Sequence, residues 1–453
     1  MRYRKHKTRC ARPGLALIAV LWIAALMMAL VSVAAQTSLL DSRVSQLENE
    51  KQRGRWACRG GVETAIALLL EDDRSYDALT DLWATNPLEL EQLDFGGVTV
   101  DIQVVDVASK LNVNTATREQ LLALPDMTED IADSILDWVD SDEDIRPGGA
   151  ESGYYLNLDI GYWARNGAIR TDRELLRIKG ITEGLFYGER ELELLSADNE
   201  GWMHYLTCYS RELNQDSDGN RKININRADR ETLITDLGLS EGQAQWVLDN
   251  RPFRQFADMI GQTSTTTATA SSAGSSAFGQ TGATGSTARS AASQTTGAAS
   301  RQTQTSSRQA TGQQQQEQPA AEPLDMATVL ELADKATLTN RRTLPGKVNL
   351  NTAGETVLTA LFEDNRELAQ NVIAAREGLG GVFLSLADLQ QVEGMSREVL
   401  QQYLDQMTLR SSIYEIHVTA VSQATGLTWQ VQAIVDREAA QGQIIYWREG
   451  ISR

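Results

Sequence analysis

The sequence of 453 residues has few of the side chains on which metal-dependent and disulfide-bonded proteins rely. Three cysteines and three histidines are too few for a disulfide framework, a cysteine-rich zinc site or a histidine-based catalytic relay. The sequence has no G-x-S-x-G, Walker or H-E-x-x-H motif, so no enzymatic activity is predicted. Basic residues are outnumbered, with 42 Lys and Arg against 61 Asp and Glu and a formal charge of -19. This balance disfavours proteins that bind nucleic-acid phosphates through a basic face.

The N-terminal segment combines a basic head with a long apolar run. Residues 1–14 contain six Lys or Arg and no acid, and Ser32 is the only polar side chain in residues 15–35. A run of this length spans the hydrocarbon core of a bilayer as a helix, and the basic flank favours the cytoplasmic side. These features alone leave open a plain signal anchor or a secretory signal peptide.

Periodicity beyond the membrane segment predicts one long helix and one sheet. Helical spacing of apolar residues continues to residue 70, and the glycines at 60 and 61 predict a bend in this segment. Apolar and polar residues alternate in residues 98–104, 414–420 and 427–435, and a short last strand is expected at 444–447. We therefore predict an α+β fold whose antiparallel sheet is split by an inserted helical region.

The predicted insertion contains an internal repeat. Residues 110–116, 222–228 and 347–353 share the pattern K-φ-N-φ-N-x-A, in which φ is apolar. The second Asn of each copy is predicted to cap the helix that follows. The copies resemble the starts of helix-hairpin-helix or SAM-like modules. Residues 262–322, rich in Ser, Thr, Gln, Ala and Gly, are predicted to form a disordered linker between the second and third modules.

Two acidic loops are candidates for a hard cation such as calcium, which prefers oxygen ligands. The first candidate set is Asp140, Asp142, Asp144 and Glu151. The second set is Asp216, Asp218 and Asn220, which matches the start of an EF-hand loop with glycine at its sixth position. The twelfth position of that loop is not the usual Glu. A solvated acidic loop and a polar turn remain the alternative interpretations, and the sequence also leaves open whether Cys58 and Cys208 pair.

Several motifs together resemble the K-type minor pseudopilins of type II secretion systems. The junction Arg12-Pro13-Gly14 before the apolar run resembles a prepilin peptidase site, which implies cleavage after Gly14 and a methylated N-terminus at Leu15. Most pilin-like subunits have a Glu at the fifth mature position, whereas this chain has Ala19 there, and the K-type subunits likewise lack the Glu. The N-V-N-T-A repeat, the DWVDSDED loop and the terminal strands extend the resemblance over nearly the whole chain. For the glycines at 60 and 61 the resemblance implies a small-residue face against which a sheet packs, in place of a bend.

The resemblance implies a domain order. Its parts are a leader at 1–14, a transmembrane helix at 15–35, pilin-like parts at 36–109 and 411–453, a first helical module with the acidic loop at 110–221, and a second helical region at 222–410 that residues 262–322 interrupt. It implies a single-pass protein of the bacterial inner membrane with its C-terminal bulk in the periplasm.

The resemblance also implies a function and partners. The function is to cap the pseudopilus tip and help start its assembly for protein export across the outer membrane. The implied partners are the I- and J-type minor pseudopilins, the pseudopilus, prepilin peptidase and the inner-membrane secretion platform, with no nucleic acid. Calcium binding in the helical part is implied as well, without fixing which carboxylates take part.

The alternative hypothesis is a membrane-anchored DNA receptor. The third repeat also resembles the helix-hairpin-helix of competence proteins, which contact phosphate through backbone N–H groups helped by Lys or Arg. Among the three predicted hairpin turns, only that around Lys179 contains a basic residue.

Overall fold

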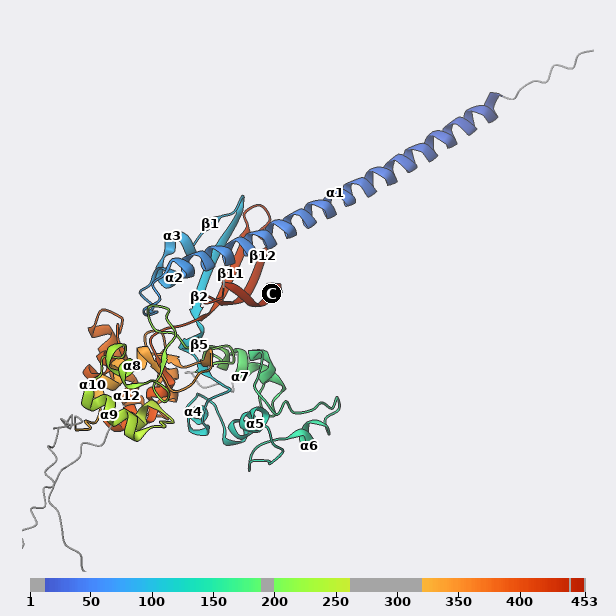
Figure 1. Cartoon of the computed structure of the whole chain (residues 1–453). Coiled ribbons are helices and arrows are strands. Elements are labelled where there is room, and N and C mark those ends of the chain that lie inside the picture. Colours follow the sequence, from blue (N-terminus) through green and yellow to red (C-terminus); the bar gives the residue numbers. More distant parts are fainter. Residues whose placement is uncertain (1–12, 189–198, 261–319, 440, 452–453) are drawn as a thin grey trace, which may run out of the picture.

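The computed structural model describes residues 13–188, 199–260, 320–439 and 441–451. Figure 1 shows a long helix whose C-terminal part lies on a sheet, with helical modules beyond the end of that helix. The predicted α+β class is confirmed, because the chain combines this helix and antiparallel sheet with an inserted helical region.

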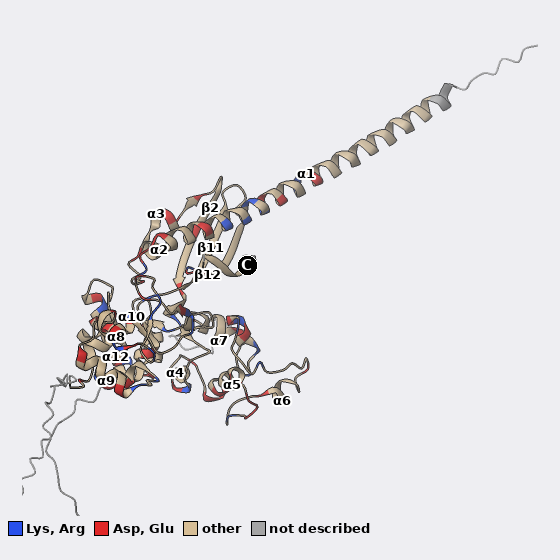
Figure 2. Cartoon of the chain, in the orientation of Figure 1, with Lys and Arg blue, Asp and Glu red and all other residues tan. Residues whose placement is uncertain are grey.

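The long helix α1 (Pro13–Glu71) is continuous. Its 59 residues correspond to about 88 Å at ~1.5 Å per residue. The described part of its N-terminal half is exposed, and Figure 2 shows that charged side chains begin only further along the helix. The helix is long and apolar enough to cross a membrane, which is consistent with a single-pass anchor.

The sheet has five strands in the order β1-β2-β11-β12-β13, and every neighbouring pair is antiparallel. The strands are β1 (Leu93–Asp94), β2 (Val98–Asp106), β11 (Ile413–Ser422), β12 (Thr428–Asp436) and β13 (Gln443–Ile451). Because β2 pairs with β11 across more than three hundred residues of sequence, the insertion leaves and re-enters the sheet at adjacent strands. This confirms the predicted split sheet. Two short helices, α2 (Leu82–Thr85) and α3 (Pro87–Leu90), connect α1 to the first strand.

Glycines on α1 let the sheet approach the helix closely. A Cβ on Gly61 would lie 2.8 Å from a Val418 methyl, and a Cβ on Gly60 would lie 2.6 Å from the Phe95 ring. Since α1 is unbroken at these positions, the glycines form the small-residue face and not the bend. Apolar side chains of α1 such as Val62 and Ile66 fill the remaining space against the sheet.

The insertion consists of three modules with one plan. Each begins with the short strand of a repeat and ends with a short strand that pairs with it in parallel, as β3–β4, β6–β7 and β9–β10. The first module holds β3 (Leu111–Asn112), α4 (Arg118–Leu122), α5 (Glu129–Val139), α6 (Ser152–Tyr155), η2 (Asp172–Arg177), α7 (Glu183–Tyr187), η3 (Trp202–His204) and β4 (Leu206–Thr207). The second holds β6 (Ile223–Asn224), α8 (Arg230–Thr235), α9 (Glu241–Asn250), η4 (Phe256–Met259), α10 (Met326–Lys335) and β7 (Ala336–Thr337). The third holds β9 (Val348–Asn349), α11 (Glu355–Leu361), α12 (Arg366–Gly378), η5 (Leu386–Gln391), α13 (Arg397–Tyr403), η6 (Leu404–Gln406) and β10 (Met407–Thr408).

The predicted capping role of the second Asn in each repeat is wrong. The residues that cap the following helices are Thr117, Asp229 and Gly354, and the first two use their side chains. The second Asn instead holds a distant backbone segment with both ends of its amide. Asn351 accepts from Phe383 N at 2.8 Å and donates to Phe383 O at 3.0 Å.

The other two repeats have the same arrangement. Asn114 makes the corresponding pair of bonds with Ile169, and Asn226 makes it with Phe253. This recurring contact connects the two halves of each module. The spacing repeated in the three copies therefore serves tertiary packing and not helix initiation.

The low-complexity segment lies inside the second module. Its described flanks are η4 before residue 261 and α10 after residue 319, and both precede the closing strand β7. The prediction that it separates the second and third modules is therefore wrong, because β7 belongs to the second. Its predicted disorder concerns residues 262–322, of which 262–319 lie outside the described residues.

A buried ionic network joins the sheet to the end of α1 and to the third module. The Arg437 guanidinium donates to the Asp77 carboxylate at 2.7 and 3.0 Å and to Ser411 O at 2.8 Å. Asp77 also accepts from the Tyr414 hydroxyl at 2.5 Å, and its own N–H donates to Leu409 O at 2.8 Å. Both Arg437 and Asp77 are buried, so this network fixes how the pilin-like part meets the insertion.

A separate two-stranded sheet lies outside the three modules. Its strands β5 (Arg211–Leu213) and β8 (Thr343–Pro345) pair in antiparallel fashion and connect the first module to the second and third.

Candidate functional site

The first acidic loop forms a cluster at the C-terminal end of α5. Thr128 caps the start of this helix by accepting from Ile131 N, and Asp137 lies in its last turn. One carboxylate oxygen each from Asp137, Asp140 and Glu151 lie within 4.8 Å of one another. A Cβ on Gly149 would lie 1.8 Å from an Asp137 oxygen, so only glycine lets the returning loop pass this close.

Arg146 provides the positive charge of this cluster. Its Nη1 lies 2.6 Å from Asp137 Oδ1 and 2.5 Å from Asp140 Oδ2. These two carboxylates in turn raise the pKa of the guanidinium above its usual value. One cation therefore faces three acids, and the cluster retains excess negative charge.

Glu151 is the least satisfied member of the cluster. Glu151 is 1% exposed, and neither of its carboxylate oxygens has a hydrogen-bond partner among the described residues. Burial, followed by repulsion from Asp137 and Asp140, raises the pKa of Glu151 to about 7. Asp140 Oδ1 is likewise buried and has no hydrogen-bond partner within the part of the chain that the structure describes. Buried carboxylate oxygens left unpaired are costly, so these residues fit a bound hard cation.

The structure brings together two of the four residues predicted from the first loop. Asp140 and Glu151 join the cluster, whereas the exposed Asp142 and Asp144 lie outside it. Asp142 Oδ1 instead accepts from Asp144 N at 2.9 Å, which shapes the turn. Sequence reasoning missed Asp137, although its position three residues before Asp140 on a helical segment was the available signal.

The second loop is a tight polar turn. Asp216 Oδ1 accepts from Asp218 N at 3.1 Å and from Asn220 N at 2.7 Å, and Asp216 N donates to Asn220 O at 2.8 Å. Gly219 has φ of +81°, as the turn requires. Asp218 and Asn220 are exposed, and among the described residues these side chains belong to no group of three potential metal ligands.

The two described cysteines do not pair in the structure. Cys58 lies in the core between α1 and the sheet, whereas Cys208 packs against the core of the helical modules. Burial raises the pKa of the Cys58 thiol to about 11 and also raises that of Cys208.

The predicted cleavage junction lies at the start of α1. Gly14 and Leu15 belong to the first turn of the helix, and residues 1–12 of the leader lie outside the described residues. Cleavage after Gly14 remains a prediction.

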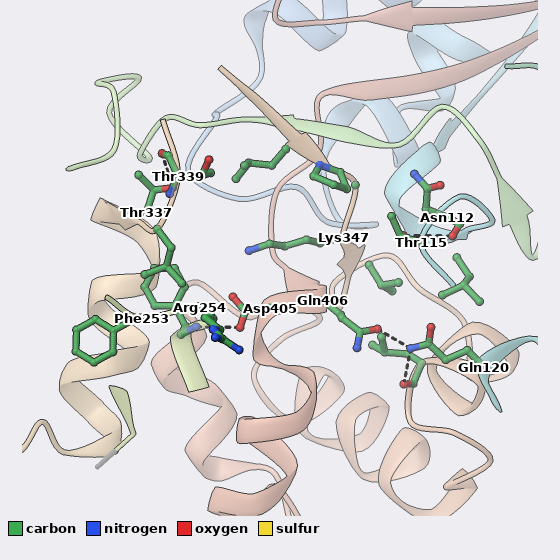
Figure 3. A pocket seen from close by; sticks show the side chains of 18 residues that line it. Asn112, Thr115, Gln120, Phe253, Arg254, Thr337, Thr339, Lys347, Asp405 and Gln406 are labelled. Atoms are coloured by element: carbon green, nitrogen blue, oxygen red, sulfur yellow. Dashed lines mark hydrogen bonds between the residues drawn. The ribbon is translucent and has the colours of Figure 1, made fainter. Parts of the chain in front are cut away.

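A cavity of about 340 Å³ lies where the three modules meet. Figure 3 shows the Lys347 side chain extending into this cavity, with Asp405 and Gln406 along one wall. Gln406 Oε1 accepts from Gln120 Nε2 at 2.5 Å, and Asp405 accepts from the N–H of Phe256 at 2.9 Å. Because these polar groups bond within the protein, the cavity is best described as a gap between packed modules.

Comparison with known proteins identifies the modules. Family models described as type II secretion system (T2SS), protein K, match residues 104–187 and residues 348–406. These two segments are therefore similar to the type II secretion system protein K family. The matched segments are most of the first module together with the third.

Two relatives and one solved structure extend the comparison. A putative type II secretion system protein K of Escherichia coli K12 is 31% identical over 199 residues, covering 38% of this chain and 59% of the relative. Type II secretion system protein K of Pseudomonas aeruginosa PAO1 is 26% identical over 270 residues, covering 54% of this chain and 73% of the relative. The crystal structure of the GspK–GspI–GspJ complex from enterotoxigenic E. coli matches at 12% identity with a TM-score of 0.46, covering 90% of this chain and 99% of that one.

Proposed function

We propose that this chain is a minor pseudopilin of the type II secretion system, which caps the pseudopilus tip and helps initiate its assembly for protein export. The observation that carries the proposal is the attachment of family-matched modules to a pilin-like helix and sheet. The apolar α1 supplies the part that packs into a filament or a membrane, and the sheet supplies the globular head.

The shape of the chain supports a position at the tip. Figure 1 shows the modules extending past the C-terminal end of α1, on the side away from its apolar half. A further subunit stacked beyond this head would meet the modules, so growth would end here. The fifth residue after the proposed cleavage site is Ala19, which offers no carboxylate to a neighbouring N-terminal amine.

The proposed location follows from α1 and its flank. The chain would cross the inner membrane once, with the basic leader in the cytoplasm and the head in the periplasm. Its proposed partners are the I- and J-type minor pseudopilins, the pseudopilus, prepilin peptidase and the inner-membrane platform. The role is structural, and we propose no catalytic activity.

Processing of the N-terminus tests the class of protein. The full chain is expressed with a prepilin peptidase and its N-terminus is measured by mass spectrometry. We expect a mature chain that begins at methylated Leu15 and restores export to a host lacking its own K-type subunit. A Gly14→Glu variant should keep its leader and fail to restore export. An intact Met1 start, or cleavage beyond residue 35, would contradict the proposal.

The proposed function includes a calcium ion held by Asp137, Asp140 and Glu151. Unpaired buried oxygens on Glu151 and Asp140 support the site, because calcium would supply the positive charge that they lack. The ion would hold the end of α5 against the loop that leads into α6. Isothermal titration of calcium into the full chain tests this, with magnesium as the comparison ion. Absence of calcium uptake would remove the metal from the proposal.

The DNA-binding hypothesis has no support and is not proposed. Lys179, the basic residue of the second hairpin turn, donates to Gly148 O at 2.9 Å and Gly149 O at 3.2 Å. Its ammonium group is therefore engaged in holding the acidic loop.

A further inference from the structure

Exposed apolar side chains concentrate in one part of the first module. Outside α1, the described residues include fourteen large apolar side chains that are exposed, and six of these lie between Ile145 and Trp163. The most exposed of these six are Ile160 at 85% and Trp163 at 70%. Single exposed apolar residues are ordinary, whereas a local concentration marks an interaction site. Figure 1 shows α6, at the start of this segment, on the outer edge of the first module.

The segment forms a loop whose two arms are held together by backbone contacts. We call residues 156–163 the apolar loop, which carries Leu156, Leu158, Ile160 and Trp163. A bond from Tyr162 N to Tyr155 O of 3.3 Å closes its base. A Cβ on Gly161 would lie 2.7 Å from Leu156 O, so the two arms of the loop run close together. Its exposed side chains are therefore held within a small area.

An aromatic cluster fixes the base of the apolar loop. Tyr155 is fully buried, with its ring stacked on Tyr162 at 5.4 Å and edge-on to Trp138 at 4.9 Å. The hydroxyl of Tyr162 donates to Arg177 O at 2.7 Å. A loop held in this way loses little conformational entropy when it binds, which favours its use as a preformed anchor.

Acidic side chains border the apolar loop. Asn166 Nδ2 donates to Asp142 O at 2.7 Å and to Glu143 Oε1 at 3.0 Å, and Ser152 Oγ donates to Glu143 Oε1 at 2.9 Å. These bonds hold the acidic segment against both ends of the apolar loop. Asp142 in that segment and Asp159 within the loop are exposed.

We propose that the apolar loop docks into a folded protein that presents an apolar cleft bordered by Lys or Arg. The apolar centre with a charged rim is the usual anatomy of a protein interface. The acidic border favours a basic partner through charge complementarity. A second copy of this chain is disfavoured because its formal charge is -19. Arg177 is exposed beside the loop, but its guanidinium lies over the Tyr162 ring at 5.0 Å. A lipid surface is disfavoured because the exposed charges on the loop and on the acidic segment include Asp159 and Asp142, whereas surface-bound segments are rich in Lys or Arg.

Site-specific photocrosslinking in cells tests this docking. The full chain carries the photoreactive substitution Ile160→benzoylphenylalanine and is produced in its own host. Leu88→benzoylphenylalanine is the control, because Leu88 is 86% exposed but lies on α3, outside the apolar loop. We expect one dominant protein adduct from position 160, at about tenfold or more the yield from position 88. Peptide mapping should place the crosslink in an apolar cleft with Lys or Arg at its border.

Two further substitutions, made on the Ile160→benzoylphenylalanine chain, test the chemistry of the contact. Trp163→Ser should reduce the adduct by about tenfold, the loss typical when an anchoring apolar side chain is removed. Asp159→Lys should reduce the adduct several-fold because it reverses a charge that favours a basic partner. Thermal stability should stay unchanged in both variants, because the side chains of Trp163 and Asp159 are exposed.

Four results would overturn the proposal. They are a yield at 160 no higher than at 88, an adduct with a second copy, adducts with lipid alone, and a protein adduct unaffected by Asp159→Lys. The proposal uses the first module's surface and does not depend on the pseudopilin role. A chain that crosslinks at 160 but is not required for export would overturn the proposed function and leave the docking intact.

Discussion

Removing the Arg437 guanidinium should destabilise the junction between the sheet and the insertion. The Arg437 side chain is 1% exposed, and one carboxylate oxygen each from Asp72, Asp77 and Asp81 lie within 4.8 Å of one another beside it. The variant Arg437→Met leaves these acids without their close cation. Removing one partner of a buried ion pair typically costs about 3–5 kcal/mol. Because the unfolding entropy of a chain this long is large, each kcal/mol lowers Tm by only about 1 °C, so the expected loss is about 3–6 °C.

The pH dependence of this loss identifies its cause. Burial, then repulsion from Asp81 and Asp77, raises the pKa of Asp72 to about 7 even with Arg437 present. Without Arg437 this pKa should rise further. A carboxyl whose folded-state pKa is raised contributes stability at low pH that is lost as pH rises through that pKa. The penalty of Arg437→Met should therefore be larger at pH 8 than at pH 5, where the acids can bind a proton.

Thermal unfolding followed by circular dichroism, on the full chain in detergent, measures both effects. The matched control is Arg74→Met, which removes an ion pair with Glu438 at 3.3 Å whose arginine side chain is 49% exposed. This exposed pair should contribute less than about 1 kcal/mol. A cost for Arg437→Met that is no larger than that of Arg74→Met, or equal costs at the two pH values, would refute the reasoning.

Three further variants test the repeat, the helix face and the metal site. Asn351→Ala leaves the Phe383 N–H and C=O without their side-chain partner, at an expected cost of about 2–5 kcal/mol in the free energy of unfolding from chemical denaturation. Gly61→Val places side-chain atoms against Val418 and should lower the same free energy by about 1–3 kcal/mol. Calcium at a hundred times its Kd should stabilise the unmodified chain by about 2.7 kcal/mol, read as a rise in Tm, and Glu151→Gln should abolish that rise.

Matched controls distinguish these effects from general damage. Asn157→Ala and Gly153→Val alter exposed positions and should leave stability within about 0.5 kcal/mol. Asp218→Asn in the second acidic loop should retain the calcium-dependent rise in Tm. If Asn351→Ala or Gly61→Val changes the free energy of unfolding no more than its control does, the corresponding contact does not stabilise the fold. A calcium-dependent rise in Tm that survives Glu151→Gln would place the ion elsewhere.

Local patterns were sufficient to predict the pilin-like frame. Alternation in β2, β11 and β12 identified strands with one buried face, and apolar residues at helical spacing on both sides of the glycine pair identified the helical character of α1. These patterns depend only on which face of an element is buried, and this information is written in the order of neighbouring residues.

The function of the repeated Asn required the tertiary structure. A side-chain amide before a helix can cap that helix or bond to a distant backbone segment, and both uses look alike in sequence. The choice is made by packing, because residues such as Phe383 come within reach only when the module closes. The same reason explains why the low-complexity segment was placed outside the second module, since the closing strand β7 has only two residues and no periodicity.

Sequence alone therefore determined the anchor, the sheet elements, the threefold repeat and the acidic loop that contains the candidate site. Tertiary structure decided which acids meet. Asp137 and Glu151 are fourteen positions apart and come together because Gly149 admits the returning loop, whereas Asp142 and Asp144, closer in sequence, turn outward. Composition can predict that a segment carries carboxylates, but only the path of the backbone brings their oxygens within a few ångströms of each other.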